Sequence, residues 1–96
     1  MTETVQLQYF GSVRAAACCA EEQAPLAENT SVLQLLHQLA DAHGEAFRGE
    51  VLSGEALRDD LTASVNGAII QHAAAEDIVL QPGDTVALFP IFPGGG

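Results

Sequence analysis

Gln81-Pro82-Gly83-Asp84, followed by Thr85-Val86-Ala87-Leu88-Phe89, is a turn that opens into an apolar run. Adjacent proline and glycine mark a turn, and the aspartate after them is a common turn residue. The run that follows shows no alternation between apolar and polar side chains. Unbroken apolar character over so few residues favours a central strand that is buried on both faces of a sheet.

Residues 5–9, Val-Gln-Leu-Gln-Tyr, predict a second strand near the other end of the sequence. Their apolar and polar side chains alternate with the period of a half-buried strand. A hairpin is predicted where residues 61–65 and 68–70 flank Asn66-Gly67, because Asn-Gly supplies the two positive-φ positions of a type I′ turn. Residues 23–28 predict a short strand, with Pro25 at an edge or an end.

The clearest predicted helix begins after Ser31, which forms a capping-box pattern with Gln34. Gly44 is placed to end this helix in a left-handed cap. A shorter helix is predicted over residues 13–18 with Ser12 as its cap, and residues 45–60 as a loop with one or two helical turns. The apolar residues of the main helix recur at three- and four-residue spacing and form one stripe: Val32, Leu35, Leu36, Leu39 and Ala40.

This order of elements predicts an α+β fold. The first and last strands, both apolar, can pair in parallel at the centre of a sheet, and the main helix can cover one face. That arrangement is a β-grasp (ubiquitin-like) fold, a mixed sheet with one main helix packed across it. Residues 1–90 are predicted to form a single β-grasp domain, and residues 91–96 a flexible C-terminal Gly-Gly tail.

Composition and charge limit the classes of function. The 96 residues suit one domain, and 48% hydrophobic content indicates a folded chain. Three arginines, no lysine and a net charge of −10 argue against nucleic-acid binding, which needs clustered cations. An acidic surface favours a basic partner, although solubility explains it equally well. No stretch approaches the roughly 20 apolar residues that span a bilayer, and the first residues do not resemble a signal peptide, so a cytoplasmic protein is expected.

The side chains that most often carry chemistry form no convincing active site or metal site. Cys18 and Cys19 are adjacent and match no metal-binding spacing, so one buried and one partly exposed free thiol are expected. Sulfur carried on a cysteine is the alternative, and it requires a low thiol pKa that only Arg14 is near enough in sequence to favour. The other candidates are interpreted as isolated histidines and solvated loop carboxylates: His37, His43, His72, Asp59-Asp60 and Glu76-Asp77.

The last residues, Pro93-Gly94-Gly95-Gly96, are the strongest candidate for function. Glycines carry no side chain, so a strip of them can thread a channel that any Cβ would block. The reactive group at the end of such a strip is the terminal carboxylate of Gly96. Ile91 and Phe92 precede the glycines without neighbouring charge, which is typical of a docking segment.

Three motifs in the last third carry a family resemblance: Val65-Asn66-Gly67, Pro82-Gly83-Asp84 before the run 86–90, and the Gly-Gly terminus. In order and spacing they resemble the ubiquitin-like sulfur carriers of the MoaD/ThiS family, closest to the small subunit of molybdopterin synthase. The resemblance implies a protein cosubstrate or non-catalytic small subunit, not an enzyme. An E1-like adenylyltransferase would use ATP to adenylate Gly96, and a sulfur-donor enzyme would convert it to a thiocarboxylate. A larger synthase subunit or another sulfur-accepting enzyme would then take the sulfur.

The resemblance also assigns roles to the residues at the end of the chain. Gly95 and Gly96 match the threading pair, and Phe89-Pro90 matches the exit from the last strand. Ile91, Phe92, Pro93 and Gly94 would lie in the partner's channel. This segment is about one residue longer than is typical, which leaves the recipient open: molybdopterin, or a related sulfur-containing metabolite, cofactor or amino acid. Two alternatives also remain, a ubiquitin-like modifier joined through Gly96 to target lysines, and an interaction module with an inert tail.

Overall fold

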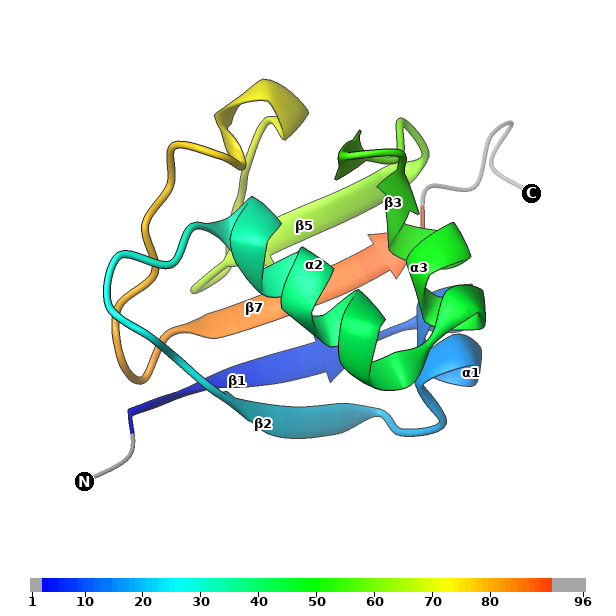
Figure 1. Cartoon of the computed structure of the whole chain (residues 1–96), viewed down its shortest axis with the longest axis horizontal. Helices are drawn as coiled ribbons and strands as arrows, with labels where there is room; N and C mark the ends of the chain where they lie inside the picture. The colour runs from blue at the N-terminus through cyan, green and yellow to red at the C-terminus, as the bar shows by residue number, and fades with distance from the viewer. Residues whose placement is uncertain (1–2, 91–96) are drawn as a thin grey trace.

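The structure, a computed structural model that describes residues 3–90, has a five-stranded mixed sheet with its longest helix, α2 (Val32–His43), packed across one face (Figure 1). The strand order across the sheet is β2-β1-β7-β5-β6. Its strands are β1 (Thr4–Tyr9), β2 (Glu21–Pro25), β5 (Leu61–Val65), β6 (Ala68–Ile69) and β7 (Thr85–Pro90). The remaining elements are α1 (Gly11–Ala17), α2 (Val32–His43), α3 (Glu45–Val51), a small hairpin of β3 (Leu52–Ser53) and β4 (Ala56–Leu57), and a 3₁₀ turn η1 (His72–Ala74).

The predicted parallel pair of strands lies at the centre of the sheet. β7 runs parallel to β1, with Tyr9 beside Leu88, and antiparallel to β5, with Leu61 beside Pro90. The β-grasp prediction is therefore confirmed. Burial on both faces holds only for residues 86–88, because the outer face has no covering helix in the described part of the chain and Phe89 stays partly exposed.

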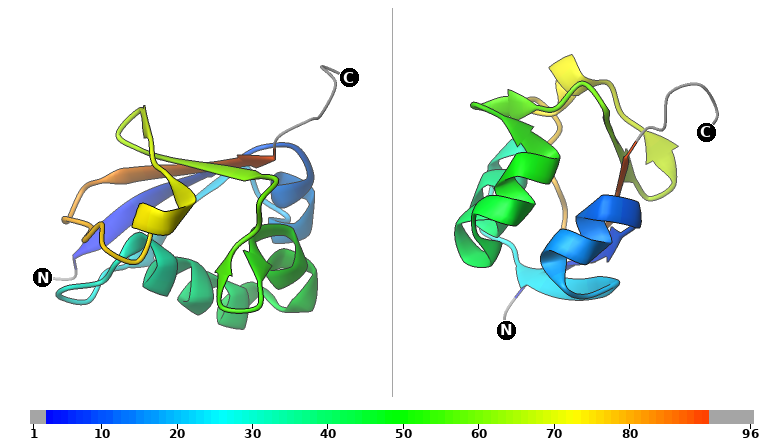
Figure 2. Two further views of the ribbon diagram at one scale, coloured as in Figure 1. Left: turned by 90° about the horizontal axis from the view of Figure 1, so that it is seen from above. Right: turned by 90° about the vertical axis from the view of Figure 1, so that its right-hand side faces the viewer.

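Helix α2 covers the inner face as its sequence pattern predicts (Figure 2). Both halves of the capping box are present: Gln34 N donates to Ser31 Oγ at 3.2 Å, and Ser31 N donates to Gln34 Oε1 at 2.9 Å. The whole predicted apolar stripe is buried in the core. Gly44 ends the helix with φ 102° and ψ −170°, which is not the left-handed cap that was predicted. Its backbone instead turns the chain directly into α3.

Two of the predicted boundaries near the N-terminus are wrong. Ser12 does not cap α1: the helix already begins at Gly11, and its N-cap residue, Phe10, makes no side-chain capping bond. The helix ends at Ala17, and its C-cap residue, Cys18, has a left-handed φ of 62°. The second strand begins at Glu21 instead of residue 23 and ends at Pro25, because its register is set by pairing with β1. Pro25 lies at the end of an edge strand, as predicted.

The region from residue 45 to 60 is more ordered than its sequence suggests. It holds α3, which is the predicted short helical part, and then the unpredicted β3–β4 hairpin. In the predicted hairpin between β5 and β6, Asn66 and Gly67 have φ values of 53° and 88°, as a type I′ turn requires. Asn66 Nδ2 also donates to Asp84 Oδ1 at 3.0 Å, and Asn66 Oδ1 accepts from Thr85 N at 3.0 Å. These bonds hold the hairpin turn against the turn that begins β7.

One polar cluster ties the helices to the edge of the sheet. Glu22 Oε2 accepts a 2.7 Å hydrogen bond from the hydroxyl of the fully buried Tyr9, and His43 at the end of α2 binds the same oxygen. Phe47 of α3 packs edge-on against Tyr9 and stacks on His43. Burial, followed by the hydrogen bond and the negative charge of Glu22, raises the pKa of Tyr9 well above its usual value. The Glu22 carboxylate thus joins β1, β2 and α2, and the ring of Phe47 adds α3 to the cluster.

Candidate functional site: the end of the central strand

Strand β7 delivers the chain to the predicted site. Phe89 and Pro90 are its last two residues, and both are partly exposed. The other predicted site residues lie outside the described residues: Ile91, Phe92, Pro93, Gly94, Gly95 and Gly96. The same is true of the predicted flexible tail as a whole. The described structure therefore fixes the place from which the tail departs.

An apolar depression surrounds this departure point on the outer face of the sheet. Side chains alternate along a strand, so Val86 and Leu88 point into the core while Phe89 points outward. Phe10 lies beside Phe89, with ring centroids 6.0 Å apart in an edge-to-face arrangement. Together with Gly11 and Pro90, the two rings line the depression. Its surface is almost wholly apolar, which suits a protein partner better than a polar metabolite.

Phe10 is a site residue that the sequence reasoning missed. Its backbone N–H donates to Leu88 O at 3.1 Å, which extends the parallel pairing of β1 and β7 by one residue. Gly11 then turns the chain into α1 with φ 56°, a conformation that side chains disfavour. The side chain of Phe10 is 48% exposed, which is unusual for phenylalanine. The available signal was the position of this aromatic residue one step after an alternating strand and directly before a glycine.

The rest of the outer face carries a mixture of small, polar and apolar side chains. Gln8, Ala87, Ser64 and Ile69 lie in one row across the sheet, because their strands pair at these positions. Ile69, at the end of that row, is 70% exposed. The outer face therefore has two exposed apolar sites: the side chain of Ile69, and the larger depression at the end of β7. Only the larger one is continuous with the predicted site.

The surroundings of Cys18 and Cys19 do not favour sulfur carried on a cysteine. Cys18 is exposed and Cys19 is only partly buried, so the prediction of one buried and one partly exposed thiol is wrong. Burial, followed by the nearby Glu22 carboxylate, raises the pKa of the Cys19 thiol and disfavours its nucleophilic thiolate. Cys18 lies at the C-terminal end of α1, the negative end of a helix dipole.

The histidines are spread over different parts of the molecule. His37 Nε2 lies 2.9 Å from Glu55 O, His72 Nε2 lies 2.6 Å from Leu61 O, and His43 binds Glu22. Within residues 3–90, no three side chains of the metal-binding types gather in one place. No helix in that range is both long and apolar enough to cross a membrane.

Comparisons with known proteins agree with this geometry. The sequence profile of the ThiS family matches residues 7–95. A Pyrococcus furiosus protein assigned as molybdopterin converting factor subunit 1 is 30% identical, with a TM-score of 0.74 over 95% of this chain and 100% of that one. The small archaeal modifier protein 1 of Haloferax volcanii is 21% identical, with a TM-score of 0.79 over 94% of this chain and 99% of that one.

A third structure, the Amycolatopsis orientalis BexX/CysO complex, contains a chain that is 18% identical, with a TM-score of 0.70 over 95% of this chain and 99% of that one. Below 25% identity these likenesses establish the fold alone. Among curated proteins no sequence match is found. The family profile covers nearly the whole chain, and it agrees with the β-grasp sheet and with the resemblance carried by the last third of the sequence. The chain belongs to the ThiS family of ubiquitin-like sulfur carriers.

Proposed function

We propose that this protein is a cytoplasmic sulfur carrier that acts through the carboxylate of Gly96. An E1-like adenylyltransferase would bind the domain, and one oxygen of that carboxylate would attack the α-phosphorus of ATP. An acyl adenylate forms and pyrophosphate leaves. A hydrosulfide equivalent from a sulfur-donor enzyme then attacks the acyl carbon and displaces AMP, leaving a thiocarboxylate. The domain itself holds no cofactor in this scheme and supplies no catalytic group.

The observation that supports this function best is the apolar depression at the end of β7. A carboxylate becomes an acyl electrophile only when its oxygen is part of a good leaving group, so the chain end must enter an active site that excludes water. A partner that closes over Phe10 and Phe89 would hold the domain while the glycines reach inward. The body would act as a handle, and the larger synthase subunit or sulfur-accepting enzyme would use the same handle.

The family's sulfur chemistry leaves the recipient of the sulfur open. Molybdopterin and other sulfur-containing metabolites, cofactors or amino acids all fit the proposal. The segment from Ile91 to Gly96 adds six residues after Pro90, with a reach of at most roughly 22 Å when extended. The active site of each partner would therefore lie within that distance of the depression.

Intact-mass measurement tests the proposal. The purified protein is incubated with the adenylyltransferase, ATP and a sulfur donor, and replacement of one oxygen by sulfur at the C-terminus is expected. Deleting Gly95 and Gly96 together should abolish the mass change without lowering thermal stability, because both residues follow the last core strand in the sequence. Unmodified protein with each cognate adenylyltransferase, in the presence of ATP, would refute the proposal.

A second candidate function uses the same activated terminus. The small archaeal modifier protein 1, which shares this fold, is named as a modifier, and we extend that role to this chain as a second proposal. In that case the acyl carbon of Gly96 would form an isopeptide bond with a target lysine, and AMP would leave. Adducts with target proteins in the same mass measurement, in place of the oxygen-to-sulfur exchange, would identify this function.

A further inference from the structure

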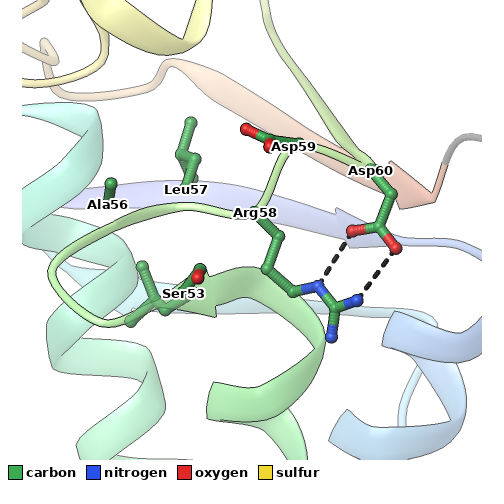
Figure 3. Close-up of a pocket in the computed structure, with 7 residues that line it drawn as sticks. Ser53, Ala56, Leu57, Arg58, Asp59 and Asp60 are labelled. Carbon is green, nitrogen blue, oxygen red and sulfur yellow. Dashed lines mark hydrogen bonds and ion pairs between the residues drawn. The ribbon is translucent and has the colours of Figure 1, made fainter.

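A pocket on the inner side of the sheet lies close to the departure point of the tail. It sits between the β3–β4 hairpin and the beginning of β5 (Figure 3). The volume is about 530 Å³. Its apolar lining comes from the buried side chains of Leu52 and Leu57, with Ala56 beside them. Its polar lining comes from Ser53 and the segment 58–60.

The only arginine in the pocket wall is already committed to other partners. Arg58 Nε and Nη2 donate to the two carboxylate oxygens of Asp60 at 2.8 and 2.9 Å. Arg58 Nη1 donates to Gly49 O at 2.6 Å. The hydrogen bonds with Asp60 raise the pKa of Arg58, and its guanidinium lowers the pKa of the Asp60 carboxyl. The two charges therefore cancel, and neither is available to a ligand without breaking a bidentate pair.

Asp59 leaves one negative charge at the pocket without a compensating cation. Its carboxylate points away from that of Asp60 (Figure 3). Among residues 3–90, the hydrogen bonds and ion pairs of the structure give it no side-chain partner. The other paired arginine, Arg48, binds Asp41 instead. A pocket with leucine side chains in its wall, and with a carboxylate that has no side-chain partner among residues 3–90, is complementary to a long side chain that ends in a cation.

The pocket lies where a partner of the tail would cover it. Leu61, directly after the Asp59-Asp60 pair, is beside Pro90 in the sheet. A protein that takes up the segment after Pro90 can therefore reach the beginning of β5 as well. The pocket therefore lies next to the end of β7, although Phe10 and the apolar depression lie on the opposite face of the sheet.

We propose that this pocket receives an arginine side chain from the partner that takes up the tail. The aliphatic stem of that arginine lies on Leu52, Ala56 and Leu57, and its guanidinium pairs with Asp59. A planar guanidinium has donors left for the hydroxyl of Ser53 after it pairs with the carboxylate. This inference rests on the proposed function for the identity of the partner, whereas the chemistry of the pocket belongs to this chain alone.

The pocket can be tested without any partner enzyme. Isotope-labelled full-length protein is titrated at low ionic strength with N-acetyl-Ala-Arg-Ala-amide, and amide resonances are followed by NMR. Saturating shifts are expected at Ser53 and over residues 57–60. The same peptide with citrulline, the neutral isostere of arginine, should bind there about two- to fivefold more weakly.

Two matched variants separate a built pocket from general attraction to an acidic protein. Asp59→Asn removes the charge and keeps a residue that suits the turn, and it should weaken peptide binding about two- to fivefold, as expected for an exposed ion pair. Glu28→Gln removes an exposed charge beside residues 81–82, at the opposite end of the sheet, and should change nothing. Shifts spread evenly over the acidic surface, or equal effects of the two variants, would overturn the proposal.

The partner's involvement has its own readout. With the activating enzyme, Asp59→Asn should raise KM for this protein about two- to fivefold and leave kcat unchanged, and Glu28→Gln should alter neither. An unchanged KM would show that the partner does not cover the pocket. Absence of sulfur transfer in wild-type protein would instead refute the proposed function, and it would leave the peptide titration unaffected.

Discussion

Replacing Tyr9 with phenylalanine should cost stability by an amount that depends on pH. The substitution keeps the buried ring and removes only the hydroxyl that donates to Glu22 at 2.7 Å. A hydrogen bond to a charged group contributes roughly 1.5–3 kcal/mol. Because Glu22 keeps its contact with His43, the low end applies, and we expect a loss of about 1.5 kcal/mol near neutral pH.

The sign of the pH dependence follows from the raised pKa of Tyr9. An unfolded chain loses the phenolic proton near the ordinary pKa of 10.0, whereas the native protein keeps it. The stabilising contribution is therefore complete below that pH, and above it falls by about 1.4 kcal/mol per pH unit. The advantage of wild type over Tyr9→Phe should be close to zero by about pH 11.

Urea denaturation followed by far-ultraviolet circular dichroism measures this difference at each pH. Cys19, whose pKa is also raised, contributes to the alkaline loss of stability in both proteins and largely cancels in the comparison. The chain has one tyrosine and no tryptophan, so tyrosinate absorbance reports on Tyr9 alone. A constant stability difference across this range, or ionisation of Tyr9 near pH 10 in protein that remains folded, would refute the reasoning.

Three further predictions test the site, the main helix and the thiols. Phe10→Ala should lower kcat/KM for adenylation roughly 5- to 30-fold, as loss of an aromatic anchor does, while Val79→Ala, which truncates another exposed apolar side chain, should leave it unchanged. Equal rates for the two variants would remove Phe10 from the docking site. Ser31→Ala breaks the capping box and should cost about 1 kcal/mol, a fall in Tm of roughly 4–8 °C, and an unchanged Tm would show that the cap is not stabilising. Maleimide should label Cys18 faster than Cys19 in a mass-resolved time course, because Cys19 is partly buried with a raised pKa, and the reverse order would contradict the structure.

The sequence predicted those elements whose local pattern and tertiary role agree. The Ser31–Gln34 capping box, the apolar stripe of α2 and the Asn66-Gly67 turn depend on a few neighbouring residues, and each is present. The parallel pairing of β1 and β7 was predictable because two apolar strands at opposite ends of the sequence need a common core.

The errors arose where distant residues decide the outcome. The beginning of β2 depends on its register with β1, and the β3–β4 hairpin has only two residues in each strand. Ser12 has a good capping side chain, but the glycine turn at residue 11 begins the helix before it. Phe10 was missed because its exposure depends on the neighbouring strand, which brings Phe89 beside it.

The position of β7 in the sheet has a consequence for biosynthesis. Its first residue pairs with Gln6, near the opposite end of the sequence, so the central ladder cannot form on a ribosome until residue 85 and those after it have emerged. Pairing between such distant segments is slow, since a long loop must close first. Strand β7 lies between β1 and β5 in the sheet, so a nascent chain that stops before β7 lacks the strand that connects them. The fold is therefore completed at nearly the same time as the glycines are synthesised. An activating enzyme that requires the folded face would not bind unfinished chains.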